Sequence, residues 1–508
     1  MTLNTGANPA FSATGGGTVT TSATTSTLTT TTGTALNVTN ATIGSAGLMF
    51  RSISANGAPS GIVLNNTGAS GGLTVTGTGT PNSGGTIQNT TGPGIALTNT
   101  LNPSFTSVTI TNTARSGISG TQVNSFRFIN GTIGTSGTGG TVDDSNIAFN
   151  TNTGGTETNL TGTVVITGNT LTNAAFHGID IFNYNGTLAD VTITGNTITS
   201  ATAAASSKGS GLRLIAFGSA STVANVTKAS LSNNTISNFP SGAGIVAQGG
   251  NADVGGPAGT FGTAGSPTNL ITISGNTIRG ESQANPMGTY AIQASVNGRG
   301  QGSFAITGNG TVANPLTNIT GNVISHAALG QVTVTSTISN NVIVANHTPN
   351  LLGSYGISVG AASTFGSSDA PNLTTTIANN AVSQTDANGI IATARDSNGT
   401  LNAKIQNNTV AAPLGGTRPG IRIDSGSANG DTTVCLNISG NISAGSNGTQ
   451  GIGLRKQGTN PNVNTFAING MAATASPGVE NYVNGLNPAG GGTLLISATS
   501  GFSNCSLP

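Results

Sequence analysis

Apolar and polar residues alternate along this chain in short runs, and the runs recur. In Gly178-Ile179-Asp180-Ile181, for example, an apolar residue stands at every second position, which is typical of a half-buried β-strand. Glycine and β-branched residues dominate, and no apolar stripe with the 3.6-residue period of a helix persists. The pattern therefore predicts an all-β chain.

A six-residue motif recurs, in which Ile or Leu is followed by any residue, Gly or Asn, Asn, any residue and an apolar residue. Ile166–Leu171 and Ile193–Ile198 are two copies. Gly-Asn and Asn-Asn pairs turn the chain readily because both residues tolerate positive φ. In stacked coils the Asn side chains at the fourth position bond to one another along the stack. The predicted ladder comprises Asn169, Asn196, Asn234, Asn276, Asn322, Asn341, Asn380, Asn408 and Asn441.

A second motif, Gly followed by Ile or Leu, alternates with the first, as at Gly211-Leu212 and Gly420-Ile421. A coil of this kind cannot bury its apolar face alone, so only stacking makes it stable. We therefore predict a single right-handed parallel β-helix of about 15–18 coils. An antiparallel sandwich is the main alternative, and it would show tight hairpin signals instead of near-identical motifs. A partial motif copy at Asn309 leaves the coil register between residues 280 and 345 open.

Three segments are expected along the 508 residues. Residues 1–32 form an N-terminal edge coil or flexible lead, and residues 33–508 form one continuous parallel β-helix. Its last part, about 483–508, caps the stack, because an uncapped coil would add to other coils. End-to-end or lateral self-association is therefore one expected form of partnership.

Composition narrows the classes of function. Charged residues make up only 5% of the chain and the net charge is +1, whereas nucleic-acid binding needs a basic stripe. No apolar run reaches the length of about 18 residues that a membrane span requires. The first residues lack the basic and apolar regions of a signal peptide, so we expect the chain to be an internal piece of a longer exported protein.

The strings Ile193-Thr-Gly-Asn-Thr-Ile198 and Gly178-Ile179-Asp180-Ile181 resemble the coils of right-handed parallel β-helix proteins of the pectin-lyase-like superfold. From about residue 30 to 500 the chain also resembles bacterial β-strand-repeat, autotransporter-like surface proteins. This resemblance implies an extracellular or cell-surface location and a structural or adhesive role. The partners it implies are cell-surface glycans or proteins of a host or a neighbouring cell.

The pectin-lyase-like resemblance also implies an alternative, a polysaccharide lyase or glycoside hydrolase. Such enzymes need acidic or basic groups that converge on adjacent coils. The hydrolase signatures are not found, since His177-Gly178 lacks a preceding Gly and Arg422-Ile423-Asp424 ends in an acid. The acidic pair Asp143-Asp144 is expected in a solvated loop. We therefore predict no catalytic residues, cofactor or metal, and favour a function without catalysis.

One outward column carries a candidate ligand site. If the Gly-Ile strands stack in register, the residue after each Ile lies in one column, which ends with Arg422 and Arg455. Asp424 and Lys456 would lie close by. Arginine suits bidentate contact with a carboxylate, so this patch is a candidate glycan-binding site. The alternative interpretation is a set of solvated charges on a strand face.

The remaining reactive residues are few. The two cysteines, Cys435 and Cys505, either form a disulfide, which requires an oxidising compartment, or are a buried thiol and an incidental one. The three histidines, His177, His326 and His347, lack metal-ligand spacing and are expected in loops or at the surface. The favoured function is thus an extracellular structural or adhesive β-helix, and a non-catalytic glycan-binding rod is a further alternative.

Overall fold

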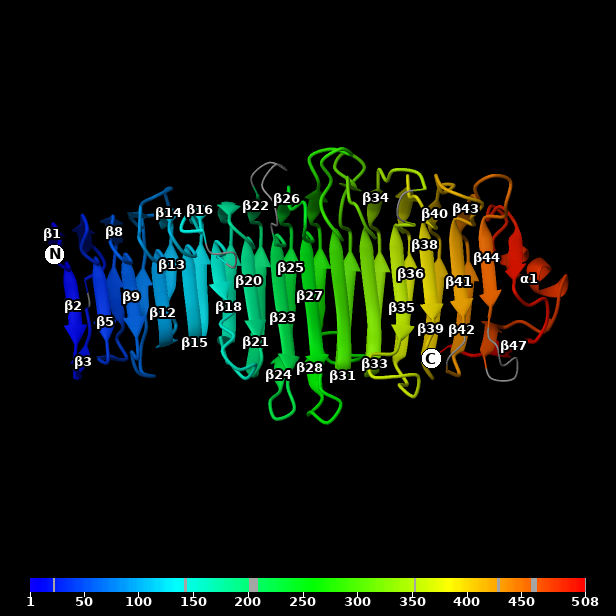
Figure 1. Ribbon diagram of the computed structural model, residues 1–508, viewed down its shortest axis with the longest axis horizontal. Helices are drawn as coiled ribbons and strands as arrows, with labels where there is room; N and C mark the ends of the chain where they lie inside the picture. Colours follow the sequence, from blue (N-terminus) through cyan, green and yellow to red (C-terminus); the bar gives the residue numbers. More distant parts are fainter. Residues whose placement is uncertain are drawn as a thin grey trace. The chain divides into compact units, whose positions relative to one another are not determined.

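The computed structural model describes residues 1–21, 23–140, 144–200, 209–350, 353–426, 430–457 and 464–507. The described chain is all β apart from one helix, α1 (Gly478–Leu486). It divides into two compact units, of which unit 1 comprises residues 1–217 and 222–242, and unit 2 comprises residues 218–221 and 243–508. Within each unit the strands stack in parallel as a β-solenoid (Figure 1).

Unit 1 contains a narrow sheet and two columns of a wide sheet. The narrow sheet is built from β1 (Thr2–Thr5), β4 (Thr27–Thr30), β8 (Ser52–Asn56), β11 (Thr86–Gln88), β14 (Thr109–Thr113), β16 (Thr132–Ser136), β19 (Thr170–Ala174), β22 (Thr197–Thr199) and β26 (Thr235–Ser237). The first column is built from β2 (Phe11–Thr14), β5 (Leu36–Thr39), β9 (Ile62–Asn65), β12 (Ile95–Leu101), β15 (Ile118–Ile129), β17 (Ile147–Phe149), β20 (Ile179–Asn183) and β23 (Leu212–Gly218). The second column is built from β7 (Leu48–Phe50), β10 (Leu73–Val75), β13 (Ser104–Thr106), the end of β15, β18 (Leu160–Thr167), β21 (Gly186–Thr194), β24 (Ala224–Val226) and β25 (Ala229–Ser232). A separate pair joins β3 (Thr18–Val19) to β6 (Thr42–Ile43).

Unit 2 repeats this plan. Its narrow sheet is built from β30 (Thr277–Arg279), β32 (Leu316–Thr317), β34 (Val342–Val344), β37 (Ala381–Ser383), β40 (Thr409–Val410) and β43 (Ile442–Ser443). The first column is built from β27 (Ile245–Asn251), β31 (Ile292–Thr307), β33 (Ile324–Ser339), β35 (Ile357–Ala362), β38 (Ile390–Ala394), β41 (Ile421–Ser425), β44 (Ile452–Lys456) and β46 (Thr493–Ile496). The second column is built from β28 (Gly259–Phe261), β29 (Ile271–Ser274), the ends of β31 and β33, β36 (Asn372–Ala378), β39 (Thr400–Gln406), β42 (Thr433–Ser439), β45 (Thr465–Asn469) and β47 (Phe502–Cys505).

Like residues lie over like residues, as the repeated motifs predict. In unit 1, Ile179 of β20 is paired with Ile147 of β17 on one side and with Leu212 of β23 on the other. The apolar motif residues, such as Ile193 in unit 1 and Ile377 in unit 2, are fully buried. The parallel β-solenoid fold is therefore confirmed, and its core is the stacked apolar side chains inside each turn.

Asparagine ladders run through the corner between the second column and the narrow sheet. The third motif residue adopts positive φ, 69° at Gly168 and 56° at Asn233, which turns the chain. The next residue is the ladder Asn, and the Asn196 side-chain amide donates to Asn234 Oδ1 over 3.0 Å. In unit 1 the ladder joins Asn169, Asn196 and Asn234.

The ladder of unit 2 corrects one predicted member. It joins Asn276, Asn309, Asn341, Asn380, Asn408, Asn441 and Asn487. Asn322 does not belong to it, because its Oδ1 accepts from the Tyr355 backbone N–H instead. Asn309 takes its place, since the Ile306 that precedes it is paired with Ile338 in the sheet.

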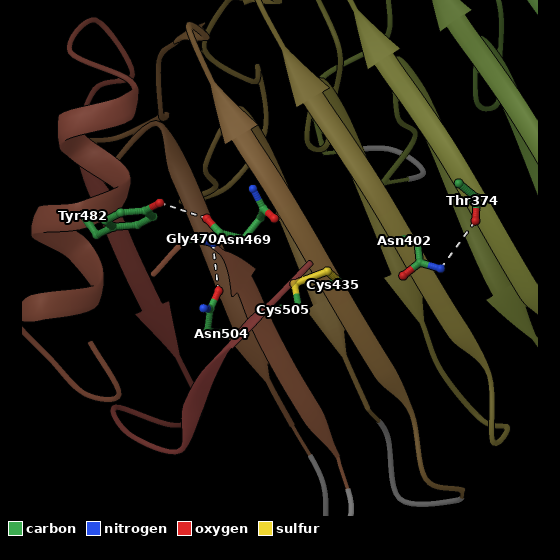
Figure 2. The surroundings of a disulfide bond; sticks show 8 residues. All are labelled: Thr374, Asn402, Cys435, Asn469, Gly470, Tyr482, Asn504 and Cys505. Carbon is green, nitrogen blue, oxygen red and sulfur yellow. Dashed lines mark hydrogen bonds between the residues drawn. A yellow bond between two sulfur atoms is a disulfide. The ribbon is translucent and has the colours of Figure 1, made fainter. Parts of the chain in front are cut away.

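The C-terminal segment closes unit 2. Asn487, at the end of α1, extends the ladder by one further residue. Cys435 of β42 and Cys505 of β47 are joined by a disulfide, so the last strand is covalently held (Figure 2). In the same region Tyr482 of α1 donates its hydroxyl to the Asn469 carbonyl over 2.8 Å (Figure 2).

Residues 1–32 carry strands that pair with the following turn. Thr2–Thr5 is paired with Thr27–Thr30, and Phe11 of β2 is paired with Leu36 of β5. The side chain of Phe11 is half-buried, whereas that of Leu36 is fully buried. The first turn is therefore part of the stack, and its apolar side chains are less covered than those of the second turn.

Candidate functional site

The predicted glycan patch lies on the outer side of β41 and β44 in unit 2. The structure corrects its register: Arg422 is paired with Gly453, and Arg455 is paired with Asp424. The two arginines therefore do not share one column. Both arginines bind Asp424, so three charged side chains lie in one cluster.

Asp424 is the centre of this cluster and is 1% exposed. Arg422 donates to it through Nε over 2.8 Å and through Nη2 over 3.1 Å. Arg455 binds the same carboxylate through Nη2 over 2.7 Å. Charge-assisted bonds of this length fix both guanidinium groups on the strands.

A third arginine, Arg395, follows β38 and joins the cluster. Burial lowers the pKa of Arg455, the neighbouring Arg422 and Arg395 act in the same direction, and Asp424 opposes them. Arg422 and Arg455 thus bind the Asp424 carboxylate, and Arg395 lies near Arg455 as a further positive charge. The Nε atoms of Arg395 and Arg455 are buried and find no hydrogen-bond partner among the described residues. We call Arg395, Arg422, Asp424 and Arg455 the arginine cluster.

Lys456 does not belong to the arginine cluster. Its ammonium donates to the Gly501 carbonyl over 2.6 Å, and burial lowers its pKa. It lines a separate cavity of about 350 Å³ together with Asn464 and Ser497. Of the four predicted site residues, the structure therefore brings together Arg422, Asp424 and Arg455.

Unit 1 carries a second charged cluster, around Asp180 of β20. Arg213 of β23 binds both oxygens of Asp180 over 2.7 Å, and Asn150 donates to Oδ2 over 2.8 Å. Asp180 is 0% exposed, and its negative charge is balanced by one guanidinium group. His177 Nε2 lies 3.8 Å from Asp180 Oδ2.

The histidines were predicted in loops or at the surface: His177 and His347 do lie in loops, whereas His326 lies in β33, and none of the three is at the surface. His177, His326 and His347 are all less than 5% exposed. Burial lowers the pKa of His177 and of His326 to about 4, so both are neutral at pH 7. Buried imidazoles at turn corners hydrogen-bond to the backbone, as His177 Nδ1 does by accepting from Ser210 N over 2.7 Å.

The acidic pair Asp143-Asp144 was expected in a solvated loop. Asp143 lies outside the described residues. Asp144 is 4% exposed, and Arg115 Nε donates to both of its oxygens. For Asp144 the solvated loop is therefore wrong, and the carboxylate is part of a structural ion pair.

Comparisons with known proteins find no match for this chain. No protein-family model, no curated protein and no solved structure matches it. Across the described ranges, no three His, Cys, Asp or Glu side chains are grouped so that they could hold a metal ion. In the same ranges no helix combines the length and the apolar character needed to cross a membrane.

Proposed function

We propose that this chain is a non-catalytic, adhesive β-solenoid segment of a bacterial surface or secreted protein that binds carboxylate-bearing glycans at the arginine cluster. The observation that carries the proposal is that two arginines share the single carboxylate of Asp424 while a third, Arg395, lies near Arg455. Two of the three retain a buried Nε–H without a partner among the described residues. The exposed parts of the Arg422 and Arg455 side chains are positioned to pair with the planar carboxylate of a uronic or sialic acid.

The scaffold supports an adhesive role. Arg422 and Arg455 lie on paired strands and are held by Asp424, so little side-chain freedom is lost when a glycan binds. Arg422 and Arg455 are 20% and 16% exposed, which leaves each guanidinium group accessible from one side. Disulfides persist in oxidising compartments, so the Cys435–Cys505 bond supports an extracellular or cell-surface location.

The absence of a second carboxylate on these strands supports binding without cleavage. Retaining and inverting glycosidases place two carboxyl groups about 5–10 Å apart around the scissile bond. The described strands β38, β41 and β44 carry one carboxylate, Asp424, and its oxygens are already bonded to two arginines. A glycan bound here would meet fixed cations and no free acid–base pair on these strands.

The test is binding of oligogalacturonate and oligoalginate to the full chain, measured by calorimetry. Replacing two cluster arginines, Arg395→Gln with Arg455→Gln, is expected to weaken binding about tenfold or more, because two charge-assisted contacts are lost. The control is Arg279→Gln, an exposed arginine on the narrow sheet of unit 2, which should bind as the wild type does. Unsaturated or reducing ends in the mixture would point to an enzyme, and unchanged binding by the double variant would exclude the arginine cluster.

A further inference from the structure

In unit 1, β20 and β23 lie side by side (Figure 1). Aromatic side chains on or next to these two strands are partly exposed. The chain has 15 Phe and 4 Tyr, and eight Phe are among its largest fully buried side chains. In contrast, Phe182, Tyr184 and Phe217 are only half-buried. They alternate with core residues such as Ile181, which is fully buried, and so they stand on the opposite side of the sheet.

The three rings form one contiguous group. The rings of Phe182 and Tyr184 are stacked, with centroids 4.4 Å apart and planes 24° from parallel. Phe217 meets Phe182 edge-on at 6.4 Å. The Arg213 guanidinium lies 5.3 Å from the centre of the Phe182 ring. We call Phe182, Tyr184, Phe217 and Arg213 the aromatic platform.

Buried polar groups fix the platform from below. Asp180 holds Arg213 through two bonds of 2.7 Å, so the guanidinium is fixed over Phe182 and its charge is balanced. His177 lies against Asp180, 4% exposed, and its Nε2 has no hydrogen-bond partner among the described residues. In contrast to the arginine cluster, the platform thus has one cation, Arg213, which is paired with one carboxylate.

A polar rim borders the rings. The Asn152 side chain and Glu157 lie near the Tyr184 hydroxyl. Glu157 accepts from the Thr153 N–H over 2.8 Å and from the Thr156 N–H over 3.0 Å, which orders the adjoining loop. Because Tyr184 and Arg213 cover the Phe182 ring, the face that can receive a ligand is the side of the Tyr184 ring turned away from Phe182, beside its hydroxyl, Asn152 and Glu157.

From this geometry we infer that the aromatic platform is a second binding site, which takes neutral sugar rings of a polysaccharide. A pyranose ring has an apolar C–H face that packs on an aromatic face and hydroxyl groups that bond to a polar rim. Neutral sugars carry no charge, which matches a platform whose only cation is already paired with Asp180.

A protein partner fits the platform less well. Stable protein interfaces bury about 800 Å² on each partner around an apolar centre. Among the described residues of unit 1, the one strongly exposed large apolar side chain is Met1, so no wide apolar surface surrounds the rings.

The experiment measures binding of cello-, xylo- and manno-oligosaccharides to the full chain by calorimetry, at low and at high salt. We expect binding of at least one series that is insensitive to salt, because stacking involves no net charge. Replacing Tyr184→Ala or Phe217→Ala should weaken it about tenfold, whereas Tyr184→Phe keeps the ring and most of the affinity. The control is Tyr290→Ala, a half-buried tyrosine in unit 2.

The outcomes separate this inference from the proposed function. The tyrosine and phenylalanine variants should still bind oligogalacturonate, and the arginine-cluster double variant should still bind the neutral sugar. No neutral sugar bound by the wild type, or binding unchanged in both alanine variants with unaltered thermal unfolding, would overturn the inference. Loss of a protein partner in these variants without any sugar binding would overturn it as well.

Discussion

Each unit has a buried aspartate on the first column of its wide sheet, but the side chains around the two aspartates differ. Asp180 in unit 1 and Asp424 in unit 2 are both almost fully buried, at 0% and 1% exposure, and each is bound through two guanidinium nitrogens of one arginine. Asp180 receives its arginine from the next strand, at the directly paired position. Asp424 receives one arginine from its own strand, Arg422, and a second from the next strand.

The difference lies in the balance of charge. In unit 1 the Arg213 guanidinium group neutralises the Asp180 carboxylate and packs on Phe182, so the charges of this pair are balanced. In unit 2 Arg422 and Arg455 share the Asp424 carboxylate and Arg395 lies near Arg455, so positive charge exceeds negative charge in the cluster. One scaffold thus builds a neutral, aromatic surface and a positive one, and the ratio of arginine to aspartate decides which ligand chemistry each surface suits.

The largest expected effect comes from removing the central carboxylate of unit 2. Asp424→Asn leaves like charges together in a partly buried place, and we expect unit 2 to lose about 3–5 kcal/mol of stability. Asp180→Asn leaves a single guanidinium on Phe182, and we expect a smaller loss in unit 1, about 1–3 kcal/mol. Hydrogen exchange of β41 and β20 amides measures each unit separately.

Two further measurements test whether the Asp180 and Asp424 clusters differ in charge balance. Added salt should recover part of the loss in Asp424→Asn, because it screens the repulsion between the arginines. The same variant should bind oligogalacturonate more tightly than the wild type, since the surplus of positive charge increases. Equal losses in the two variants, or weaker binding by a folded Asp424→Asn, would show that the two clusters do not differ in charge balance.

The disulfide offers the next largest effect and acts on unit 2. The bond closes a loop between residues 70 apart in the sequence, and removing a native disulfide typically costs about 2–4 kcal/mol. In Cys435→Ala with Cys505→Ala, β47 and β45 should exchange first, whereas the amides of unit 1 should keep their protection. The wild type with reductant should behave as the double variant does. Equal loss of protection in both units would contradict this expectation.

The fold could be predicted from the sequence because it is built from repeated motifs. Eight of the nine predicted ladder residues lie in the two ladders, and only Asn322 does not. Ile319-Thr-Gly-Asn322 has the motif letters, but Ile319 makes only an isolated bridge to Met287. The motif specifies a turn, and strand pairing elsewhere decides which turn enters the ladder.

The candidate sites were less predictable, for two physical reasons. Arg455 was predicted to pair with Arg422 but is paired with Asp424, two residues further along the strand. A shift of two residues leaves every side chain on the same face of the sheet, so the hydrophobic pattern cannot detect it. The aromatic platform unites residues from two turns, Phe182 and Phe217, that are remote in sequence. One feature of the sequence pointed to the platform: Phe182 stands two residues after Asp180 and therefore lies on the same outward face of the strand.

The smallest of the three effects is a dependence on pH that belongs to the Asp180 cluster. His177 is buried beside Asp180, and burial lowers its pKa from 6.5 to about 4. The unfolded chain therefore binds a proton between pH 6.5 and pH 4 that the folded chain does not, so stability is complete above pH 6.5 and falls toward pH 4. We expect a loss of about 2–3 kcal/mol in this window.

In His177→Asn the side-chain oxygen still accepts from Ser210 N, and the loss should disappear. Because His326 in unit 2 has a similar pKa, the measurement is hydrogen exchange of β20 in unit 1, where an unchanged pH dependence in His177→Asn would contradict the assignment.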